Sequence, residues 1–421
     1  MITWLNDRQS LGIRPGLERM NSLLDLLGRP QDSYRTVHVA GSNGKGSVAA
    51  LLARTLQLSG HRTGLYTSPH LVEFAERIEV DGQTISTDDL SPLLEEMRTT
   101  VTPLDHVGSP PTFFEVTTAA ALTHFATEGV GWAVVEAGMG GGGDATNVIH
   151  PELTVITNVS LEHTAHLGYD ARSIARKKAG IIEPGVPLVT AATGDALEVL
   201  EKEAANRGSP IVVIGKDYRF KSADGVLLIN GPNGERGYKV GMAGAHQLEN
   251  AAVAVAGSDA LRKRGVDITD VAIEKALQST SLRGRLETFH HDGVRVTIDG
   301  AHNPAAAKSL RDSLENSGKF DLIVGFNADK DWPAILQHLL ALARRVWAVP
   351  VRSPRSLDPH RVADHVGDHM KFSVRDSFES AYQQGRAAGA TDILVAGSLF
   401  LAGEARAVIT GHDLSEVGGS Q

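Results

Sequence analysis

The chain has 421 residues, of which 42% are hydrophobic and 22% charged, and because this length exceeds what one hydrophobic core usually supports, we expect two domains. A net charge of -9 argues against a broad basic surface for nucleic acid, and the absence of cysteine excludes disulfides, thiolate metal sites and a cysteine nucleophile. The sequence contains neither a secretory leader pattern nor an apolar run of membrane-spanning length, so we expect a cytoplasmic protein without a membrane partner.

Residues 37–47 form a short apolar run that breaks into a glycine-rich turn and continues into a helix-forming segment. Loops of this kind bind polyphosphates, because their main-chain N–H groups converge on phosphate oxygens at a helix N-terminus. Lys45 supplies a positive charge, and the Ser47 hydroxyl can ligate Mg²⁺. In the usual phosphate loop Ser or Thr follows the lysine directly, whereas Gly46 intervenes here. A glycine-rich turn without a ligand is the alternative interpretation.

The segments that follow alternate between short apolar strands and helices, which predicts a parallel sheet covered on both faces. We expect strands at residues 62–66, 132–136 and 153–157, and helices at residues 114–125 and 172–181. Paired turn signals between residues 217 and 240 predict one or two hairpins. Helices are predicted at residues 243–263 and 270–278.

A second α/β pattern begins after a predicted hinge at residues 283–287. Its strands are expected at residues 294–298, 322–324, 346–349 and 393–395, with helices beginning at Pro304, Ser377 and Leu401. The predicted domains are therefore residues 1–282 and 288–421, and residues 416–421 are expected to form a loose tail.

Three further groups of residues carry chemistry. Glu136 stands at the end of a predicted strand before a glycine run and is a candidate metal ligand, with a capping carboxylate as the alternative. His163 follows another strand and can bind a metal through a neutral ring nitrogen, although a hydrogen-bonded surface histidine is the more common situation. Lys177 and Lys178 usually indicate a solvated helix face, and the alternative is that one of them enters the site.

These features together resemble the folylpolyglutamate synthase and dihydrofolate synthase family of Mur-type ATP-dependent amide ligases. The phosphate loop of that family has the same interposed glycine, and Ser42 replaces its usual threonine. Similar signatures occur in order along essentially the whole chain, at residues 67–71, 76–78, 112–115, 136–147, 161–164, 178–181, 246–251, 284–287, 299–304 and 397–400. The resemblance implies a Mur-ligase-like P-loop N-terminal domain with a mostly parallel sheet, and a smaller doubly wound α/β C-terminal domain.

The resemblance implies a ligase that uses ATP to join the α-amino group of L-glutamate to a folate or pteroate carboxylate. The carboxylate first receives the γ-phosphoryl group, and the amine then attacks this acyl phosphate. In the family one Mg²⁺ is held by residues matching Ser47 and Glu136. A second is held by residues matching Glu136, His163 and a carbamylated Lys178, because a carbamate offers the oxygen ligands that an ammonium lacks.

The resemblance also distributes roles over the remaining site residues. It implies that nucleotide is bound by Asn43, Gly44, Lys45, Gly46, Ser47, Asn250, Arg285 and Asp299. It implies substrate contacts from Ser68, Pro69, His70, Phe114, Asp144, Asp299, His302 and Ser398, of which Ser398 belongs to the glutamate site. The residues with catalytic roles would be Lys45, Glu136, His163, Lys178 and His302. Domain closure around the hinge is the expected gating step, and the expected state is a monomer.

Two departures from the family pattern leave the acceptor undecided. Gly142 and Gly143 replace basic and bulky side chains in the loop on the pterin side, and Glu162 replaces an aspartate beside His163. Dihydropteroate and reduced folate both fit the sequence. The alternatives are a Mur-type ligase for a different acceptor and a P-loop ATPase that is not a ligase.

Overall fold

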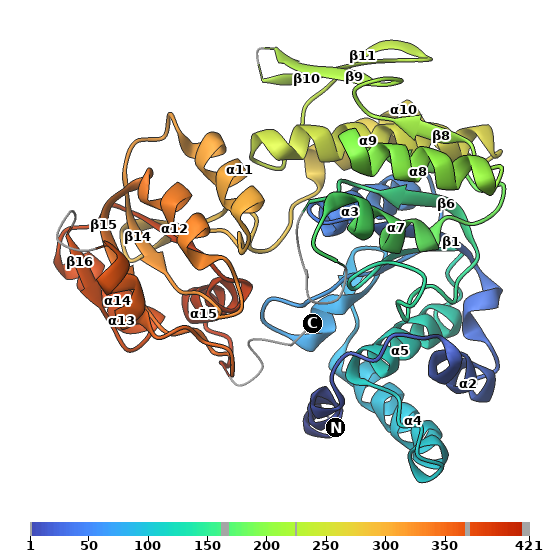
Figure 1. Cartoon of the computed structure of the whole chain (residues 1–421), viewed down its shortest axis with the longest axis horizontal. Helices are drawn as coiled ribbons and strands as arrows, with labels where there is room; N and C mark the ends of the chain where they lie inside the picture. Colours follow the sequence, from blue (N-terminus) through green and yellow to red (C-terminus); the bar gives the residue numbers. More distant parts are fainter. Residues whose placement is uncertain (1, 161–167, 224, 367–370, 415–421) are drawn as a thin grey trace.

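The computed structural model describes residues 2–160, 168–223, 225–366 and 371–414, which contain two separate large sheets (Figure 1). The first sheet has eight strands in the order β4-β3-β2-β5-β1-β6-β7-β8, in which the pairs β2–β3 and β3–β4 are antiparallel and the other pairs are parallel. Its strands are β1 Arg35–Ala40, β2 Thr63–Tyr66, β3 Ile78–Val80, β4 Gln83–Thr84, β5 Trp132–Glu136, β6 Pro151–Ile156, β7 Leu188–Thr190 and β8 Ile211–Val213. The predicted strands and the mostly parallel sheet are confirmed.

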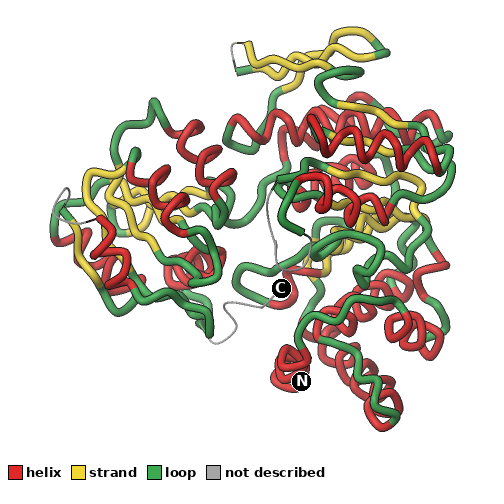
Figure 2. Tube along the Cα trace, viewed as in Figure 1, coloured by secondary structure: helices red, strands yellow, loops and turns green. Residues whose placement is uncertain are grey.

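Helices cover both faces of this sheet (Figure 2) because successive strand side chains point to opposite sides. In β1, Val37 and Val39 pack against α3, α9 and α10, whereas Ala40 packs on the other face with α7 and α8. A further cluster joins α2, α4 and α5 to β2 and β5. The helices are α1 Ile2–Asp7, α2 Glu18–Leu26, α3 Lys45–Leu58, α4 Thr87–His106, α5 Phe113–Thr127, α7 Ala171–Lys178, α8 Gly194–Asn206, α9 Ala245–Lys263 and α10 Asp270–Ser279.

A small antiparallel sheet lies beside α9, at the top of Figure 1. It consists of β9 Arg219–Ala223, β10 Val226–Gly231 and β11 Gly234–Tyr238, joined as two hairpins. Leu227 and Ile229 of β10 are fully buried in the same cluster as α3 and α9. The hairpins predicted from the turn signals are therefore confirmed.

The second large sheet has six strands in the order β12-β13-β17-β14-β15-β16, and only β12 is antiparallel to its neighbour. Helices α11, α12 and α13 share one core with Leu322 and Val324, and α14 and α15 share the opposite core with Ile323. The doubly wound prediction is confirmed. The elements are β12 Glu287–His291, β13 Val294–Ile298, β14 Phe320–Val324, β15 Ala343–Ala348, β16 Phe372–Val374, β17 Asp392–Ala396, α11 Pro304–Leu314, α12 Trp332–Leu340, α13 Pro359–Val366, α14 Phe378–Ala387 and α15 Leu399–Thr410.

A 3-10 turn and a glycine account for two of the boundary differences between prediction and structure. The helix predicted for residues 172–181 is α-helical only as far as Lys178 and continues as η4 Ala179–Ile181. The helix predicted from residue 243 begins at Ala245 because Gly244 has a φ of 109°. The other 3-10 turns are η1 Arg8–Leu11, η2 Pro30–Ser33 and η3 Phe74–Arg77. Among the helices that the structure describes, none combines the length and apolarity needed to cross a membrane.

Candidate active site

The phosphate loop connects β1 to α3 and is fixed by close contacts that only glycine permits. Gly41 has a φ of 142°, and a Cβ there would lie 1.8 Å from Thr157 Oγ1. Gly44 has a φ of 86° at the start of α3, and its Cβ would lie 2.2 Å from Asn250 Oδ1. The Thr157 hydroxyl donates to the main-chain oxygen of Asn43 at 2.7 Å. The loop is therefore held in one shape by β6 and α9, which lie on either side of it.

Gly46, the residue that departs from the usual phosphate-loop pattern, faces a carboxylate. A Cβ on Gly46 would lie 3.4 Å from Glu136 Oε2, so the glycine leaves open space between the first turn of α3 and that oxygen. Ser47 follows it and is buried. Lys45 Nζ donates to Ser42 O at 3.3 Å. The interposed glycine thus places the loop hydroxyl one residue further along the helix and keeps the approach to Glu136 free of side-chain atoms.

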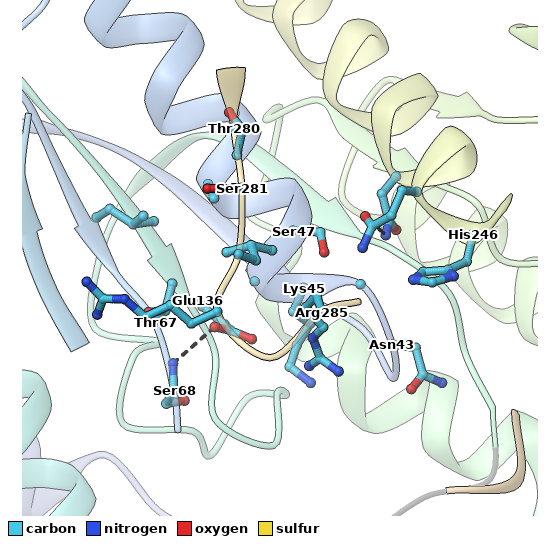
Figure 3. Close-up of a pocket in the computed structure, with 18 of the residues that line it drawn as sticks. Asn43, Lys45, Ser47, Thr67, Ser68, Glu136, His246, Thr280, Ser281 and Arg285 are labelled. Carbon is cyan, nitrogen blue, oxygen red and sulfur yellow. Dashed lines mark hydrogen bonds between the residues drawn. The ribbon is translucent and has the colours of Figure 1, made fainter. Parts of the chain in front are cut away.

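Glu136 ends β5, the strand that pairs with β1. Its side chain is only 4% exposed and accepts a hydrogen bond from the Ser68 N–H at 3.0 Å, as Figure 3 shows. Burial raises the pKa of Glu136, and the nearby Lys45, the Ser68 N–H, Arg285 and Arg77 oppose this rise. The Glu136 carboxylate and the hydroxyl of the buried Ser47 are hard oxygen ligands of the kind that Mg²⁺ prefers. The residues present therefore fit a magnesium ion.

A cavity of about 630 Å³ lies between the two large sheets. The phosphate loop lies on one side of it, in the first unit, which contains the eight-stranded sheet. On the other side is the start of the second unit, which contains the six-stranded sheet. Lys45 and Arg285 point into it between Glu136 and Asn43 (Figure 3). Most of the predicted site residues line this cavity, namely Asn43, Gly44, Lys45, Gly46, Ser47, Ser68, Pro69, His70, Glu136, Asn250, Arg285, Asp299 and His302. Residues separated by more than 250 positions in the sequence thus share one space.

A smaller pocket adjoins the cavity and contains Ser398. The two spaces share Pro69, His70 and His302. Ser398 begins α15 and accepts from the Phe400 N–H at 3.1 Å, so its hydroxyl also caps that helix. Lys330, Arg355 and Asn327 line the same pocket, and Asn327 Oδ1 is buried without a hydrogen-bond partner among the described residues. These three polar residues were not predicted.

Three of the predicted site residues that the structure describes line neither the cavity nor the smaller pocket. Phe114 packs against Gly138 and the Tyr66 ring. Asp144 accepts four hydrogen bonds within its own loop, from the Met139 N–H, the Gly140 N–H, the Thr146 N–H and the Thr146 hydroxyl. Lys178 is fully buried beneath the phosphate loop and donates to Gly41 O at 2.8 Å and to Met139 O at 3.1 Å. His163 lies outside the described residues.

The second unit meets the phosphate loop directly through a contact that the sequence did not indicate. Asn303 Nδ2 donates to Asn43 Oδ1 at 3.0 Å, and Asn303 Oδ1 caps α11 through the Ala306 N–H at 2.8 Å. The Asn43 main-chain N–H in turn donates to the Asn158 side chain at 3.0 Å. Asn303 lies within the recognised signature at residues 299–304, which was the one signal that could have identified it.

Asp299 stabilises the connection between the two units. One of its carboxylate oxygens accepts from the Leu286 N–H at 3.0 Å, and the other accepts from the Ala301 N–H at 2.9 Å. Burial raises the pKa of Asp299, and Arg285 opposes this effect. Burial lowers the pKa of His246, which lies at the start of α9 and lines the same cavity, and the charge of Asp299 opposes this effect. Burial therefore shifts the pKa values of titratable groups on both units that line the cavity.

Comparison with known proteins agrees with this geometry. The Mur ligase middle domain matches residues 39–257, and the Mur ligase, glutamate ligase domain matches residues 284–399. A dihydrofolate synthase/folylpolyglutamate synthase of Bacillus subtilis is 32% identical over 375 residues, which cover 84% of this chain and 85% of the relative. The chain belongs to the folylpolyglutamate synthase/dihydrofolate synthase family. This is a family of ATP-dependent glutamate ligases acting on folates, so the predicted enzyme class is confirmed.

Solved structures of this family superpose on nearly the whole chain. Folylpolyglutamate synthase of Mycobacterium tuberculosis, complexed with ADP, has a TM-score of 0.89 and 33% identity, covering 98% of this chain and 97% of that one. A family member from Escherichia coli, in complex with DHPP and ADP, has a TM-score of 0.88 and 27% identity, covering 97% of each chain. The predicted fold class is therefore confirmed along the length of the chain.

Proposed function

We propose that this chain uses ATP to join the α-amino group of L-glutamate to the carboxylate of a folate-type acceptor through an acyl phosphate. The observation that carries the proposal is the cavity between the two sheets, which brings the phosphate loop, Glu136 and the residues around Asp299 into one space. A carboxylate is a poor electrophile. Transfer of the γ-phosphoryl group makes it reactive, and attack by the amine then forms the C–N bond and releases phosphate.

In this proposal ATP lies along the phosphate loop with its phosphates between Lys45 and Arg285. The loop amides and the N-terminus of α3 favour the negative charge, and the two side chains add positive charge where the transferred group becomes most charged. Asn250 and His246 lie on the α9 side of the same cavity and are proposed to contact the nucleoside. The M. tuberculosis relative is complexed with ADP, which supports this use of the cavity.

The proposed metal ligands for the triphosphate are Ser47 and Glu136. Bound Mg²⁺ would neutralise phosphate charge there. The second proposed ion requires Lys178 to become a carbamate, by addition of CO₂ to its neutral amine with loss of one proton. A carbamate keeps a single N–H, so at least one of the two hydrogen bonds from Lys178 to Gly41 O and Met139 O would break. His163, the remaining proposed ligand, lies outside the described residues.

Carbamylation has a direct test. Lys178→Ala is expected to lose activity and to regain part of it with millimolar acetate or formate, which can occupy the place of the carbamate. Lys177→Ala is the matched control, because Lys177 is exposed on the same helix. If small carboxylates gave no recovery in a folded Lys178→Ala protein, Lys178 would be a structural ammonium that ties the phosphate loop to the loop after β5.

The pocket around Ser398 is the proposed site for L-glutamate. Glutamate brings two carboxylates, and Lys330 and Arg355 offer the matching positive charges in that pocket. The buried Asn327 Oδ1 can accept a hydrogen bond from the ammonium group before it loses its proton. His302 lies where the pocket joins the main cavity, so an amine held there can reach a carboxylate activated beside the phosphate loop.

The proposed acceptor is dihydropteroate, reduced folate or both. The B. subtilis relative carries both enzyme names, which supports a dual activity, and the E. coli relative binds DHPP. In this chain the loop with Gly142 and Gly143 contacts the N-terminal segment, where the Gly16 N–H donates to Gly143 O at 3.3 Å. A side chain at Gly143 would come within 3.3 Å of Gly16 N, so the missing bulk makes room for that segment.

Closure around residues 283–287 is the proposed gating step. Arg283 lies 3.3 Å from Glu76 of the first unit, and the Gly300 N–H donates to Gly284 O at 2.8 Å. These contacts span the connection on both sides and would change together if the units rotated. Small-angle scattering with and without an ATP analogue tests this step, and an unchanged radius of gyration would contradict it.

The proposed activity is tested by measuring phosphate release in the presence of ATP and Mg²⁺. We expect release only when glutamate and an acceptor are both present, with dihydropteroate and tetrahydrofolate tried separately. Release that needs neither compound would instead support a P-loop ATPase. Release that needs glutamate and a different acceptor would support another Mur-type ligase.

A further inference from the structure

Arg77 is the largest fully buried side chain in the described part of the protein. It ends η3, and its guanidinium group lies 5.3 Å from the centre of the Phe113 ring and 6.0 Å from that of Phe74. Burial lowers the pKa of Arg77, whereas Tyr66, Glu136 and Glu76 oppose this effect. An arginine nevertheless stays protonated in proteins. A permanent charge at this depth is costly unless its donors are used, so its partners indicate what it does.

Arg77 Nε donates to Nδ1 of His70 at 2.8 Å. Arginine has only donors, so Nδ1 of His70 must be the acceptor and must carry no proton. The ring proton of His70 therefore sits on Nε2. A doubly protonated imidazolium would place an N–H against the Arg77 N–H, which the short contact forbids. The chemistry of the partner thus fixes the tautomer of His70.

His70 lies between the two spaces that the ligase reaction must connect. The residue lines both the main cavity and the pocket around Ser398, and it is only 7% exposed. Two residues before it, the Ser68 N–H donates to Glu136, so the same short segment contacts the candidate metal ligand.

We propose that Arg77 is a positioning residue that holds His70 as a neutral hydrogen-bond donor, and that His70 Nε2–H donates to the oxygen that gains charge when glutamate attacks the acyl phosphate. This inference rests on the proposed ligase function. In this step the C–N bond forms, the C–O bond to phosphate breaks, and the amine proton leaves with the phosphate or to water. His70 keeps its proton throughout, so it acts as an electrostatic stabiliser and not as a base.

The first test reads the tautomer in the intact protein. The ¹⁵N shifts of the His70 ring, assigned by comparison with His70→Gln, are expected to show a protonated Nε2 and an unprotonated Nδ1. In Arg77→Met both tautomers of the His70 ring are expected to be populated. A wild-type ring protonated at Nδ1, or at both nitrogens near neutral pH, would overturn the proposal.

The second test is a double-mutant cycle on turnover. Loss of one donor to a developing oxyanion costs about 10²-fold in kcat or more, so His70→Ala and Arg77→Met are each expected to lower kcat about that much. If Arg77 acts through His70, the double variant should fall no more than about threefold below His70→Ala. KM for ATP should change less than kcat. His70→Gln should recover part of the rate, because its amide still donates.

A control separates positioning from packing. Arg8 is also buried and donates to the Pro111 main-chain oxygen, away from the cavity. Arg8→Met reports what the loss of a buried arginine does by itself, and kcat is expected to stay within about threefold of wild type. A double variant whose kcat falls by the product of the two single losses would overturn the proposal. If Arg77→Met does not fold, the wild-type ring shifts and the kcat of His70→Gln against His70→Ala still decide it.

Failure of this inference can be distinguished from failure of the proposed function. A wild-type protein without glutamate-dependent phosphate release would refute the ligase, whatever the His70 tautomer. An active wild-type ligase whose kcat is unaffected by His70→Ala would refute only the role of His70 and Arg77.

Discussion

Replacing Gly46 by alanine separates the stability of the phosphate loop from its function. Gly46 is the second residue of α3 and does not have a positive φ, so alanine can adopt its backbone conformation. The added Cβ would lie 3.4 Å from Glu136 Oε2, which is ordinary van der Waals contact, and 3.9 Å from the Glu136 carboxyl carbon. The nucleotide-free protein should therefore accept the methyl group without strain.

The two expected effects have opposite signs. Gly→Ala at a compatible site stabilises a protein by about 0.4–1 kcal/mol through the unfolded state. In a chain of 421 residues this raises Tm by about 0.5–1 °C. An ion bound to Glu136 would keep several water molecules, and the methyl occupies the space that they need. We expect kcat/KM for ATP to fall at least tenfold, which corresponds to about 1.4 kcal/mol of lost transition-state stabilisation.

The measurements are a thermal melt without ligands and the rate of glutamate-dependent phosphate release. Gly131→Ala is the matched control, because its Cβ would meet nothing closer than 3.9 Å and the residue lies far from the phosphate loop in the sequence. The control should gain similar stability and keep full activity. A Gly46→Ala protein with wild-type activity would refute the claim that this glycine keeps space beside Glu136 for the reaction.

Three further substitutions test other contacts of the site. Asn303→Ser keeps a good helix cap but removes the hydrogen bond to Asn43. Tm should therefore stay the same while kcat/KM falls about fivefold, the equivalent of about 1 kcal/mol. A drop in Tm with unchanged kinetics would contradict this. Burial raises the pKa of Glu136 above its ordinary value of 4.5, so its stabilising contribution is complete below that value and is lost as pH rises through the raised pKa. Glu136→Gln should therefore raise the Tm of the ligand-free protein at pH 8, with a smaller gain near pH 5, and abolish turnover; a gain independent of pH would refute the burial argument. Lys330→Met should raise KM for glutamate at least tenfold and leave KM for ATP unchanged. Substitution of Arg355 should raise KM for glutamate less, because Arg355 is half exposed and paired with Asp329. Equal effects of Lys330→Met on both KM values would argue against a glutamate pocket.

The parallel core was predictable because its strands are buried on both faces and therefore read as continuous apolar runs. Residues 132–136 and 153–157 have this character, and the predicted bounds of 132–136 match β5. Helix α4 was missed because Pro92 and Pro103 interrupt its pattern, although it contributes Leu94 and Met97 to the core. Short edge strands such as β4 carry too few residues to show a period.

The site was predictable where one signature supplied neighbouring residues and was not predictable where distant side chains meet. The loop from Asn43 to Ser47 was found because a phosphate-binding loop needs those residue types in that order. Glu136 was found because it ends a predicted strand before a glycine run. The contact between Asn43 and Asn303 joins positions that only the packing of the two units brings together. No local pattern shows that the Asp144 carboxylate accepts hydrogen bonds within its own loop, or that Arg77 donates a hydrogen bond to the ring of His70.

Phosphate release measured with ATP, Mg²⁺, glutamate and a pteroate or folate acceptor tests the central claim most directly. The proposed geometry predicts release only when acceptor and glutamate are both present, together with one new amide bond for each phosphate released, detected by mass spectrometry of the acceptor. Phosphate release without glutamate, or release without a matching gain of glutamate on the acceptor, would contradict it.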